Sequence, residues 1–396
     1  MFINSINEIK EKSTLEGLIT PIYNGLNISN VGSLILENFQ IANDFEKLKP
    51  FKDFTIPNKN KVLLLLVDAL GYNLLNFALN NSKISTLRHI LDKGMFTVLT
   101  STFPSTTSTA LPSIYSVSDP SIHGVMGFRF YAREFGDIIN PLFQTLSVNK
   151  NCSIKYEPNW LIPIKTIFEI LKDHDIPNFS IVRSDYLHSA FDKAVYRGSE
   201  EIGYLTYSDM LEQVKNLLKL DVAFINAYLW SIDALSHRFG PFSQVVLNEL
   251  EIIDVLLGEI LKVVDNDTLL LITADHGQID TTNNEIIELE KLEESKSIIL
   301  PITDVRVPYI TLKESALKNT LSALTNIKVL TRDEAFNLNL FGKKRIFEER
   351  VGDLVIVIKD GSAISYLSDK KELELIGKHG NLTSDEMLVP FILYYK

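Results

Sequence analysis

Two apolar segments of strand length, each followed by carboxylate or imidazole side chains, restrict what this chain can fold into. Residues 269–273 and 61–67 are largely apolar without a helical period, which is typical of strands buried on both faces of a parallel sheet. The first leads into Asp275, His276 and Gly277, and the second into Asp68. Because ligands bind beyond the carboxyl ends of strands in open α/β sheets, we expect a site there. Gly277 is expected to let the backbone turn sharply away.

Strand-like and helix-like segments alternate along most of the chain, which predicts an α/β fold with a mostly parallel sheet sandwiched by helices. Strands are expected at 61–67, 96–100, 179–182, 221–229, 269–273 and 387–394, and helices at 73–94, 164–173, 207–219 and 243–264. We predict a core of residues 61–280 and 371–396, an N-terminal extension (1–60) packed on it, and an inserted smaller α+β lobe (281–370), where Glu and Lys become frequent. Residues 124–160 are rich in aromatic and turn residues and give no consistent prediction.

Composition narrows the range of partners. The 396 residues include 39 Lys and Arg against 50 Asp and Glu, a net charge of −11, which disfavours binding to duplex nucleic acid or an anionic membrane. The single cysteine, Cys152, excludes an internal disulfide and a cysteine-rich metal site. The first residues carry no secretory signal, and no apolar run approaches the roughly 18 residues of a membrane span. We therefore expect a cytoplasmic protein.

Residues 101–112 are dense in hydroxyl side chains and include two prolines. Thr and Ser are favoured where a helix begins, and a helix N-terminus presents free N–H groups that suit a phosphate. This segment is either part of an anion site or a Ser/Thr-rich helix start without chemistry.

Three carboxylates and three imidazoles are expected near the strand ends. They are Asp68, Asp233, Asp275, His237, His276 and His379. Asp233 and His237 lie four residues apart, so one helical turn places them on the same side. Mixed nitrogen and oxygen ligands suit two zinc-like ions, and two ions roughly 4 Å apart can clamp the attacking and leaving oxygens of a phosphoryl transfer. The remaining four histidines, His89, His123, His174 and His188, do not cluster and are interpreted as structural.

The ordered motifs resemble those of the alkaline phosphatase superfamily, and most closely its type I phosphodiesterase / nucleotide pyrophosphatase branch. They are Val67-Asp68-Ala69-Leu70-Gly71, Phe103-Pro104-Ser105-Thr106-Thr107 running to His123-Gly124, Asp233 and His237 through Pro241, Thr273-Ala274-Asp275-His276-Gly277, and Lys378-His379-Gly380. They cover about residues 60 to 395 in the family's order. The resemblance implies an alkaline-phosphatase-like core and a metal-dependent phosphoric ester hydrolase.

The resemblance also implies a role for each motif residue. One divalent ion would be held by Asp68, Thr107, Asp275 and His276, and a second by Asp233, His237 and His379; zinc is expected, with manganese as the alternative. Thr107 would attack phosphorus and form a phosphothreonine that water then hydrolyses. The substrate would be a small phosphate ester, with nucleotides among the candidates. Thr107 is favoured over Thr106 because counting back without a gap from His123-Gly124 reaches Thr107.

Other functions stay open. The branch usually has Asn three residues after the nucleophile, where this chain has Ala110, so a phosphomonoesterase or phosphonate hydrolase on the same core is an alternative. A binding or scaffold protein that kept the fold and lost the activity is an alternative of another class, although all seven expected positions are occupied. Residues 128–131 (Phe-Arg-Phe-Tyr) either line a slot for a second phosphate substituent or only pack a cap.

Overall fold

The computed structural model describes residues 1–396 except 147–151, 283, 301–302, 314–315 and 367–369. Its centre is an eight-stranded sheet with the order β1-β3-β18-β10-β2-β9-β7-β8. Every neighbouring pair is parallel except those made by β18, which runs antiparallel to both β3 and β10. The strands are β1 (Phe2–Ile3), β2 (Lys61–Val67), β3 (Met95–Thr100), β7 (Asn178–Arg183), β8 (Glu200–Tyr204), β9 (Ala223–Leu229), β10 (Thr268–Thr273) and β18 (Leu388–Tyr394). The predicted mostly parallel sheet is confirmed.

The strands at the centre of the sheet are buried along their whole length. Every residue of β2, β9 and β10 is buried, which explains why their sequences are apolar without alternation. The three strands are adjacent and parallel, so their carboxyl ends meet at one edge of the sheet.

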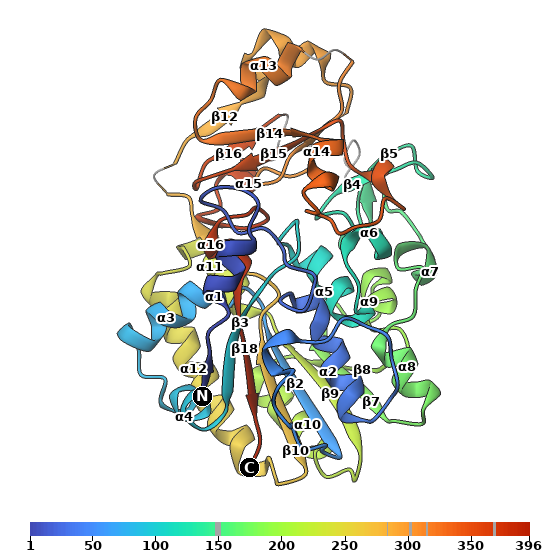
Figure 1. Cartoon of the computed structure of the whole chain (residues 1–396), viewed down its shortest axis with the longest axis vertical. Coiled ribbons are helices and arrows are strands. Elements are labelled where there is room, and N and C mark those ends of the chain that lie inside the picture. The colour runs from blue at the N-terminus through green and yellow to red at the C-terminus, as the bar shows by residue number, and fades with distance from the viewer. Residues whose placement is uncertain (147–151, 283, 301–302, 314–315, 367–369) are drawn as a thin grey trace.

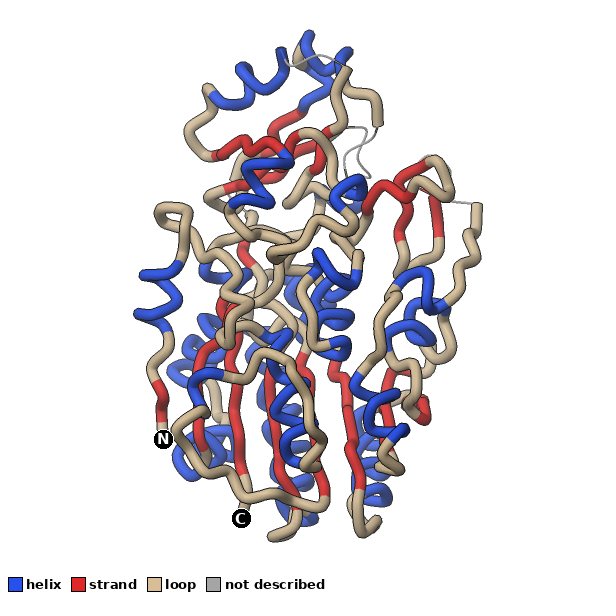
Figure 2. The backbone as a smooth tube through the Cα atoms, turned by 45° about the vertical axis from the view of Figure 1, so that its right-hand side comes forward, coloured by secondary structure: helices blue, strands red, loops and turns tan. Residues whose placement is uncertain are grey.

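Helices flank the sheet on its two faces (Figure 2). One group packs together from α2 (Val31–Asn38), α5 (Thr107–Ser116), α8 (Ile167–Asp173) and α9 (Ala190–Val195), and the other from α3 (Tyr72–Asn81), α4 (Ser85–Lys93), α10 (Tyr207–Leu217), α11 (Ser231–Phe239) and α12 (Gln244–Val263). In the described part of the chain, no helix combines the length and the apolar character needed to cross a bilayer.

The single helix predicted over residues 73–94 is wrong, because the structure has two helices there, α3 and α4. The chain is extended at Ser82, where α3 ends. The start of α4 is held by Asp254 of α12, whose carboxylate accepts hydrogen bonds from the backbone N–H groups of Thr86 (3.0 Å) and Leu87 (2.6 Å). A cap supplied from 167 residues away in the chain leaves no local sequence signal.

The segment before the core adds a strand to the main sheet, and the aromatic segment forms a small sheet of its own whose apolar side chains join the same hydrophobic core. Residues 1–60 add β1 to its edge beside β3 and contribute α1 (Ile6–Lys12), α2 and the 3-10 helices η1 (Ile28–Asn30) and η2 (Lys49–Phe51). Downstream, α6 (Pro120–His123) leads to the antiparallel strands β4 (Phe130–Ala132), β5 (Asp137–Asn140) and β6 (Thr145–Leu146), and then to α7 (Pro158–Leu161). The guanidinium of Arg350 stacks over Phe130 and Trp160 at 5.1 and 5.0 Å from the ring centroids.

Residues 281–370 project from the core at the top of Figure 1. The chain leaves through β11 (Ile279–Asp280) and returns through β17 (Gly377–Lys378), and these two strands pair with each other. Between them lie two small sheets, β12-β16 and β13-β15-β14, and ten residues, including Ile310, Ile356 and Ile358, form a second apolar cluster. These features support our proposal of an inserted lobe.

The remaining elements of the lobe and of the C-terminal segment are short. They are β12 (Ile286–Glu288), η3 (Leu289–Lys291), η4 (Glu293–Ser297), β13 (Tyr309–Ile310), α13 (Ala316–Ser322), β14 (Ile327–Thr331), α14 (Arg332–Asn337), η5 (Glu348–Arg350), β15 (Leu354–Ile358), β16 (Ala363–Ser365), α15 (Lys370–Leu373) and α16 (Ser384–Met387).

Candidate active site

The seven residues predicted for the site come together at the carboxyl edge of the sheet. Asp68 directly follows β2, Asp275 and His276 follow β10, Asp233 and His237 lie on α11 after β9, Thr107 begins α5 after β3, and His379 follows β17. Five of the seven line one cavity of about 270 Å³, while Asp275 and His276 are completely buried beside it.

Thr107 presents its hydroxyl to this cluster. Its Oγ1 lies 3.1 Å from Nε2 of His276. The neighbouring Thr106 is the N-cap residue of α5, and its hydroxyl instead contacts the hydroxyls of Ser108 (3.1 Å) and Thr109 (3.3 Å). Of the two threonine hydroxyls, that of Thr107 is therefore the one that contacts His276.

All three histidines are oriented by backbone carbonyl groups. The Nδ1 atoms of His237, His276 and His379 lie 2.7, 3.1 and 2.9 Å from the carbonyl oxygens of Gly377, Gly277 and Ser105. A carbonyl only accepts hydrogen bonds, so in a neutral imidazole Nδ1 carries the proton and Nε2 keeps a free lone pair. Burial lowers the pKa of His276 and of His379, which keeps both rings neutral near pH 7. This is the arrangement that orients histidines as metal ligands.

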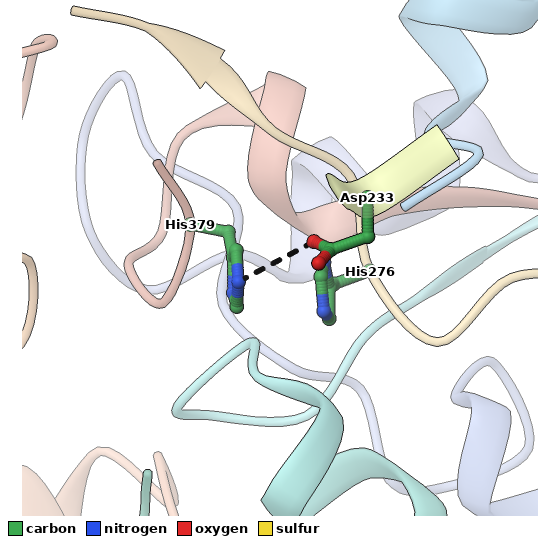
Figure 3. Close-up of side chains that lie close together, drawn as sticks. All are labelled: Asp233, His276 and His379. Carbon is green, nitrogen blue, oxygen red and sulfur yellow. Dashed lines mark ion pairs between the residues drawn. The ribbon is translucent and has the colours of Figure 1, made fainter. Parts of the chain in front are cut away.

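Figure 3 shows how two of these rings face Asp233. The His276 and His379 rings stack with centroids 3.8 Å apart. Oδ1 of Asp233 lies 3.7 Å from Nε2 of His379 and 3.4 Å from Nε2 of His237. Ligand atoms of Asp233, His276 and His379 all lie within 4.8 Å of one another, as do those of Asp68, Asp275 and His276.

The three carboxylates are held close together with little compensating charge. Burial, with the charges of Asp275 and Asp233, raises the pKa of Asp68 well above its usual range. Burial also raises the pKa of Asp275 to about 6. Burial acts on Asp233 in the same direction, but the neighbouring His237 and His379 outweigh it and lower the pKa of this carboxyl. Bound cations would relieve the cost of holding these acids ionised.

Backbone geometry brings the strand ends together. A Cβ atom on Gly277 would lie 2.1 Å from the carbonyl oxygen of Asp385 and 2.9 Å from Cα of Gly71. Gly277 has no positive φ, so close approach of the backbone, and not a left-handed conformation, is what excludes a side chain there. Ala69 has a φ of +62°, and its N–H donates to Oδ1 of Asp275 at 3.2 Å. Such a conformation is uncommon for a residue with a side chain.

The sequence did not identify two residues that position the carboxylates. The hydroxyl of Tyr228, at the end of β9, donates to Oδ2 of Asp68, and the amide Nε2 of Gln278 donates to Oδ1 of Asp233 at 2.5 Å. Gln278 could have been found because it directly follows the Asp275-His276-Gly277 motif. Tyr228 could have been found from its place at a strand end.

The structure also shows where His123, interpreted as structural, and the aromatic segment, left open by the sequence, lie. His123 is buried, with Nε2 2.8 Å from Oγ of Ser113, and burial lowers its pKa to about 3. Of the aromatic segment, Phe128 lines the cavity, whereas Phe130 is buried and pairs with Ile139 across β4 and β5. The lining and the packing interpretations therefore each hold for one residue.

The fold and this cluster define a class of protein. A mostly parallel sheet gathers aspartates, histidines and a helix-start threonine at its carboxyl edge, as expected from the resemblance to the alkaline phosphatase superfamily. Within it, a family model described as type I phosphodiesterase / nucleotide pyrophosphatase matches residues 62–382, which is more than half of the chain. The chain belongs to this family.

Solved structures share the fold at low sequence identity. An inactive variant of murine ectonucleotide pyrophosphatase / phosphodiesterase 5 in complex with AMP superposes with a TM-score of 0.67 at 17% identity, covering 85% of this chain and 88% of that one. Phosphonoacetate hydrolase from Sinorhizobium meliloti 1021 in complex with phosphonoacetate gives a TM-score of 0.65 at 19% identity, covering 85% and 90%.

Curated relatives match over shorter stretches. An uncharacterized pyrophosphatase/phosphodiesterase of Schizosaccharomyces pombe is 23% identical over 316 residues, spanning 70% of this chain and 60% of that protein. Phosphopentomutase of Clostridium perfringens (strain SM101 / Type A) is 32% identical over 119 residues, spanning 30% of this chain and 28% of the enzyme. The chain thus spans less than two thirds of either relative.

Proposed function

We propose that this protein is a two-metal-dependent phosphodiesterase or nucleotide pyrophosphatase that cleaves phosphate diester or pyrophosphate bonds through a phosphothreonine on Thr107. The observation that carries the proposal is the position of the Thr107 hydroxyl, at a helix start and 3.1 Å from Nε2 of His276 in the aspartate–histidine cluster. Family membership supports hydrolysis of phosphoric esters.

The donor set fits two divalent ions. Oδ1 of Asp68 and Oδ2 of Asp275 are buried and have no hydrogen-bond partner among the described residues, and an unpaired buried carboxylate oxygen is costly. We assign Asp68, Thr107, Asp275 and His276 to one ion and Asp233, His237 and His379 to the other, with zinc expected from the mixed nitrogen and oxygen set. When bound, the ions would lower the pKa of the Thr107 hydroxyl and stabilise charge on the attacking and leaving oxygens.

In the proposed reaction, Thr107 attacks phosphorus in the first step and water hydrolyses the intermediate in the second, while residues of the chain position the reacting groups. The Thr107 oxygen forms a bond to phosphorus while the bond to the leaving oxygen breaks, and the departing alcohol takes up the hydroxyl proton. The phosphothreonine keeps the second ester substituent; water then attacks phosphorus, releases the monoester product and regenerates the Thr107 hydroxyl. Thr107 is the first residue of α5, and the free N–H groups of a helix start favour a phosphoryl oxygen bound there. The backbone carbonyls behind the histidines hold each Nε2 toward the cluster.

Diesters should be turned over faster than monoesters. Beyond Thr107 the cavity is lined by Phe128, Phe143 and Tyr186, and its described lining residues include no Lys or Arg. Burying one aromatic substituent against such walls favours the diester by roughly ten- to a hundredfold in kcat/KM. The measurement compares bis-p-nitrophenyl phosphate with p-nitrophenyl phosphate, with zinc added and after chelation. A preference for the monoester would instead support the phosphatase alternative.

Asp275→Asn should lose bound metal and activity together. The substitution keeps the shape of the side chain but removes the buried negative charge. Mutating a residue that only hydrogen-bonds to a metal ligand lowers metal affinity roughly 10–100-fold, and the loss of a ligand charge should lower it further. Metal content per chain after gel filtration, measured by atomic emission, is compared with turnover. Asp173→Asn is the matched control, because Asp173 lies at an exposed position. Asp254→Asn would not serve, because Asp254 caps α4. Full metal content with normal turnover in Asp275→Asn would refute the assignment.

A further inference from the structure

The same cavity is also lined by aromatic side chains that are not part of the aspartate–histidine cluster, and they form one wall of it. Phe128, Phe143, Tyr186, Phe191 and Tyr196 contribute to this wall, and Asp192 is the one carboxylate among them. Phe128 and Phe143 meet edge to face, with ring centroids 5.9 Å apart. The wall is built from the segment around β4 and β5 and from α9, which packs against α5, the helix that starts with Thr107 (Figure 1).

Asp192 is buried and incompletely paired. It is 6% exposed, and no hydrogen-bond partner among the described residues reaches its Oδ2. Its backbone N–H donates to Oγ of Ser189, the N-cap residue of α9, at 3.0 Å, so the helix start is already capped by another side chain. A buried carboxyl oxygen without a partner is destabilising unless a ligand donates to it.

The charges around Asp192 favour a cation as that ligand. Burial and the neighbouring Glu201 raise the pKa of Asp192 to about 8, with the Ser189 side chain acting in the opposite direction. This carboxyl is therefore protonated near pH 7 unless a cation beside it lowers its pKa again and favours the carboxylate. The guanidinium of Arg183 lies over the rings of Tyr186 and Trp230 at 5.5 and 4.2 Å from the centroids and pairs with Asp185, so these groups already engage this cation. The described lining residues include no Lys or Arg to neutralise the carboxylate.

The walls and the size of the cavity point to a small cationic group. Aromatic faces attract an ammonium ion through their quadrupole, most strongly where water is excluded. The volume of about 270 Å³ is below the roughly 300–1,000 Å³ typical of pockets for drug-sized ligands, and the phosphate must share it. The site therefore suits a short substituent better than an extended one.

We propose that Asp192 is a substrate-specificity residue that accepts a hydrogen bond from a protonated amine, so that the preferred substrates are small phosphodiesters whose retained alcohol carries an ammonium group. This inference rests on the proposed phosphodiesterase function. When the ammonium group binds, Asp192 loses its carboxyl proton to water, the N–H donor satisfies Oδ2, the positive charge offsets the carboxylate, and the aromatic wall covers the carbon chain. Asp192 would bind this substituent and take no part in breaking the phosphorus–oxygen bond.

Two esters of the same shape test the inference. Both release p-nitrophenol: 2-aminoethyl p-nitrophenyl phosphate carries the ammonium group, and n-propyl p-nitrophenyl phosphate replaces it with a methyl group. The wild-type protein should hydrolyse the aminoethyl ester with a kcat/KM about tenfold or more above that of the propyl ester, the range expected for one charge-assisted hydrogen bond. In Asp192→Asn this ratio should fall to near one, and in Asp173→Asn, an exposed Asp→Asn control, it should stay at the wild-type value.

The outcomes separate this inference from the proposed function. If the wild-type protein hydrolyses both esters at equal efficiency, the ammonium preference is refuted while the phosphodiesterase function stands. If it hydrolyses neither of them nor bis-p-nitrophenyl phosphate, the proposed function fails and the inference fails with it. An ammonium preference that persists in Asp192→Asn would refute the role of Asp192. Should that variant not fold, the wild-type comparison of the aminoethyl ester with thymidine 5′-p-nitrophenyl phosphate still decides, because a preference for the nucleoside ester would overturn the inference.

Discussion

Replacing Thr107 with alanine should lower kcat by on the order of 10³-fold or more while the fold is retained. Because the carboxylate and imidazole ligands remain, it should lower the metal content less than Asp275→Asn does. Removing a covalent nucleophile typically costs a large factor because the remaining groups cannot act alone. The Thr107 side chain is half-buried at the surface of the cavity, so the loss of its hydroxyl leaves no large void. Turnover of bis-p-nitrophenyl phosphate and metal content per chain are the two measurements.

Two matched variants make this result specific to the hydroxyl of Thr107. Thr107→Ser keeps a hydroxyl at the same place and should retain part of the turnover, whereas Thr106→Ala removes only a hydroxyl that is bonded to Ser108 and Thr109 and should cost less than about tenfold. Mass spectrometry of the intact protein, quenched during turnover of bis-p-nitrophenyl phosphate, should show an adduct with a p-nitrophenyl phosphoryl group in the wild type and not in Thr107→Ala. Near-normal turnover in Thr107→Ala with loss in Thr106→Ala would transfer the nucleophile to Thr106.

The part of the site that follows from strand ends could be predicted from the sequence. Buried parallel strands are recognisable as apolar runs, and the rule that ligands bind at their carboxyl ends places Asp68 beside Asp275 without knowledge of the sheet order. The helical spacing of Asp233 and His237 then adds a second pair of side chains. His379 depends on the return of the chain from residues 281–370, and only the family's motif order located it.

The rest of the cavity could not be predicted, because its contacts join segments distant in the chain. Ser189 and Asp192 have the pattern of an ordinary helix start, with an N-cap serine and an acid three residues later, so nothing local marks Asp192 as part of a cavity wall. The segment 124–160 has no strong period because part of its packing comes from Arg350, far along the chain, stacked over Phe130 and Trp160. Local propensity is weak where such contacts decide the structure.

Arg306→Met should lower the free energy of unfolding by about 3–5 kcal/mol, the cost of leaving a buried charge without its partner. The Arg306 and Glu386 side chains are 1% and 0% exposed, and two guanidinium nitrogens donate to the two oxygens of Glu386 at 3.1 and 2.8 Å. Methionine keeps an apolar chain in the same space, so the effect reports the unpaired Glu386 rather than a cavity. Urea unfolding followed by circular dichroism measures the change.

Arg345→Met is the matched control, because the same substitution there breaks an exposed ion pair. The Arg345 and Asp333 side chains are 38% and 77% exposed, and such pairs contribute about 0–1 kcal/mol. Equal losses of stability in the two variants would show that burial of the Arg306–Glu386 pair is not what matters.

The buried pair of Arg306 and Glu386 should also hold the segment that carries His379 in place. Glu386 accepts a hydrogen bond from the backbone N–H of Asn381 at 3.0 Å, and the Asn381 side chain donates to the carbonyl oxygen of Arg306. Asn381 lies two residues after His379, so movement of Glu386 is transmitted to a proposed metal ligand. We therefore expect Arg306→Met to weaken metal binding as well as stability, and Arg345→Met to leave metal binding at the wild-type level. Loss of stability in Arg306→Met with unchanged metal affinity would confine the network to the packing of residues 281–370 on the core.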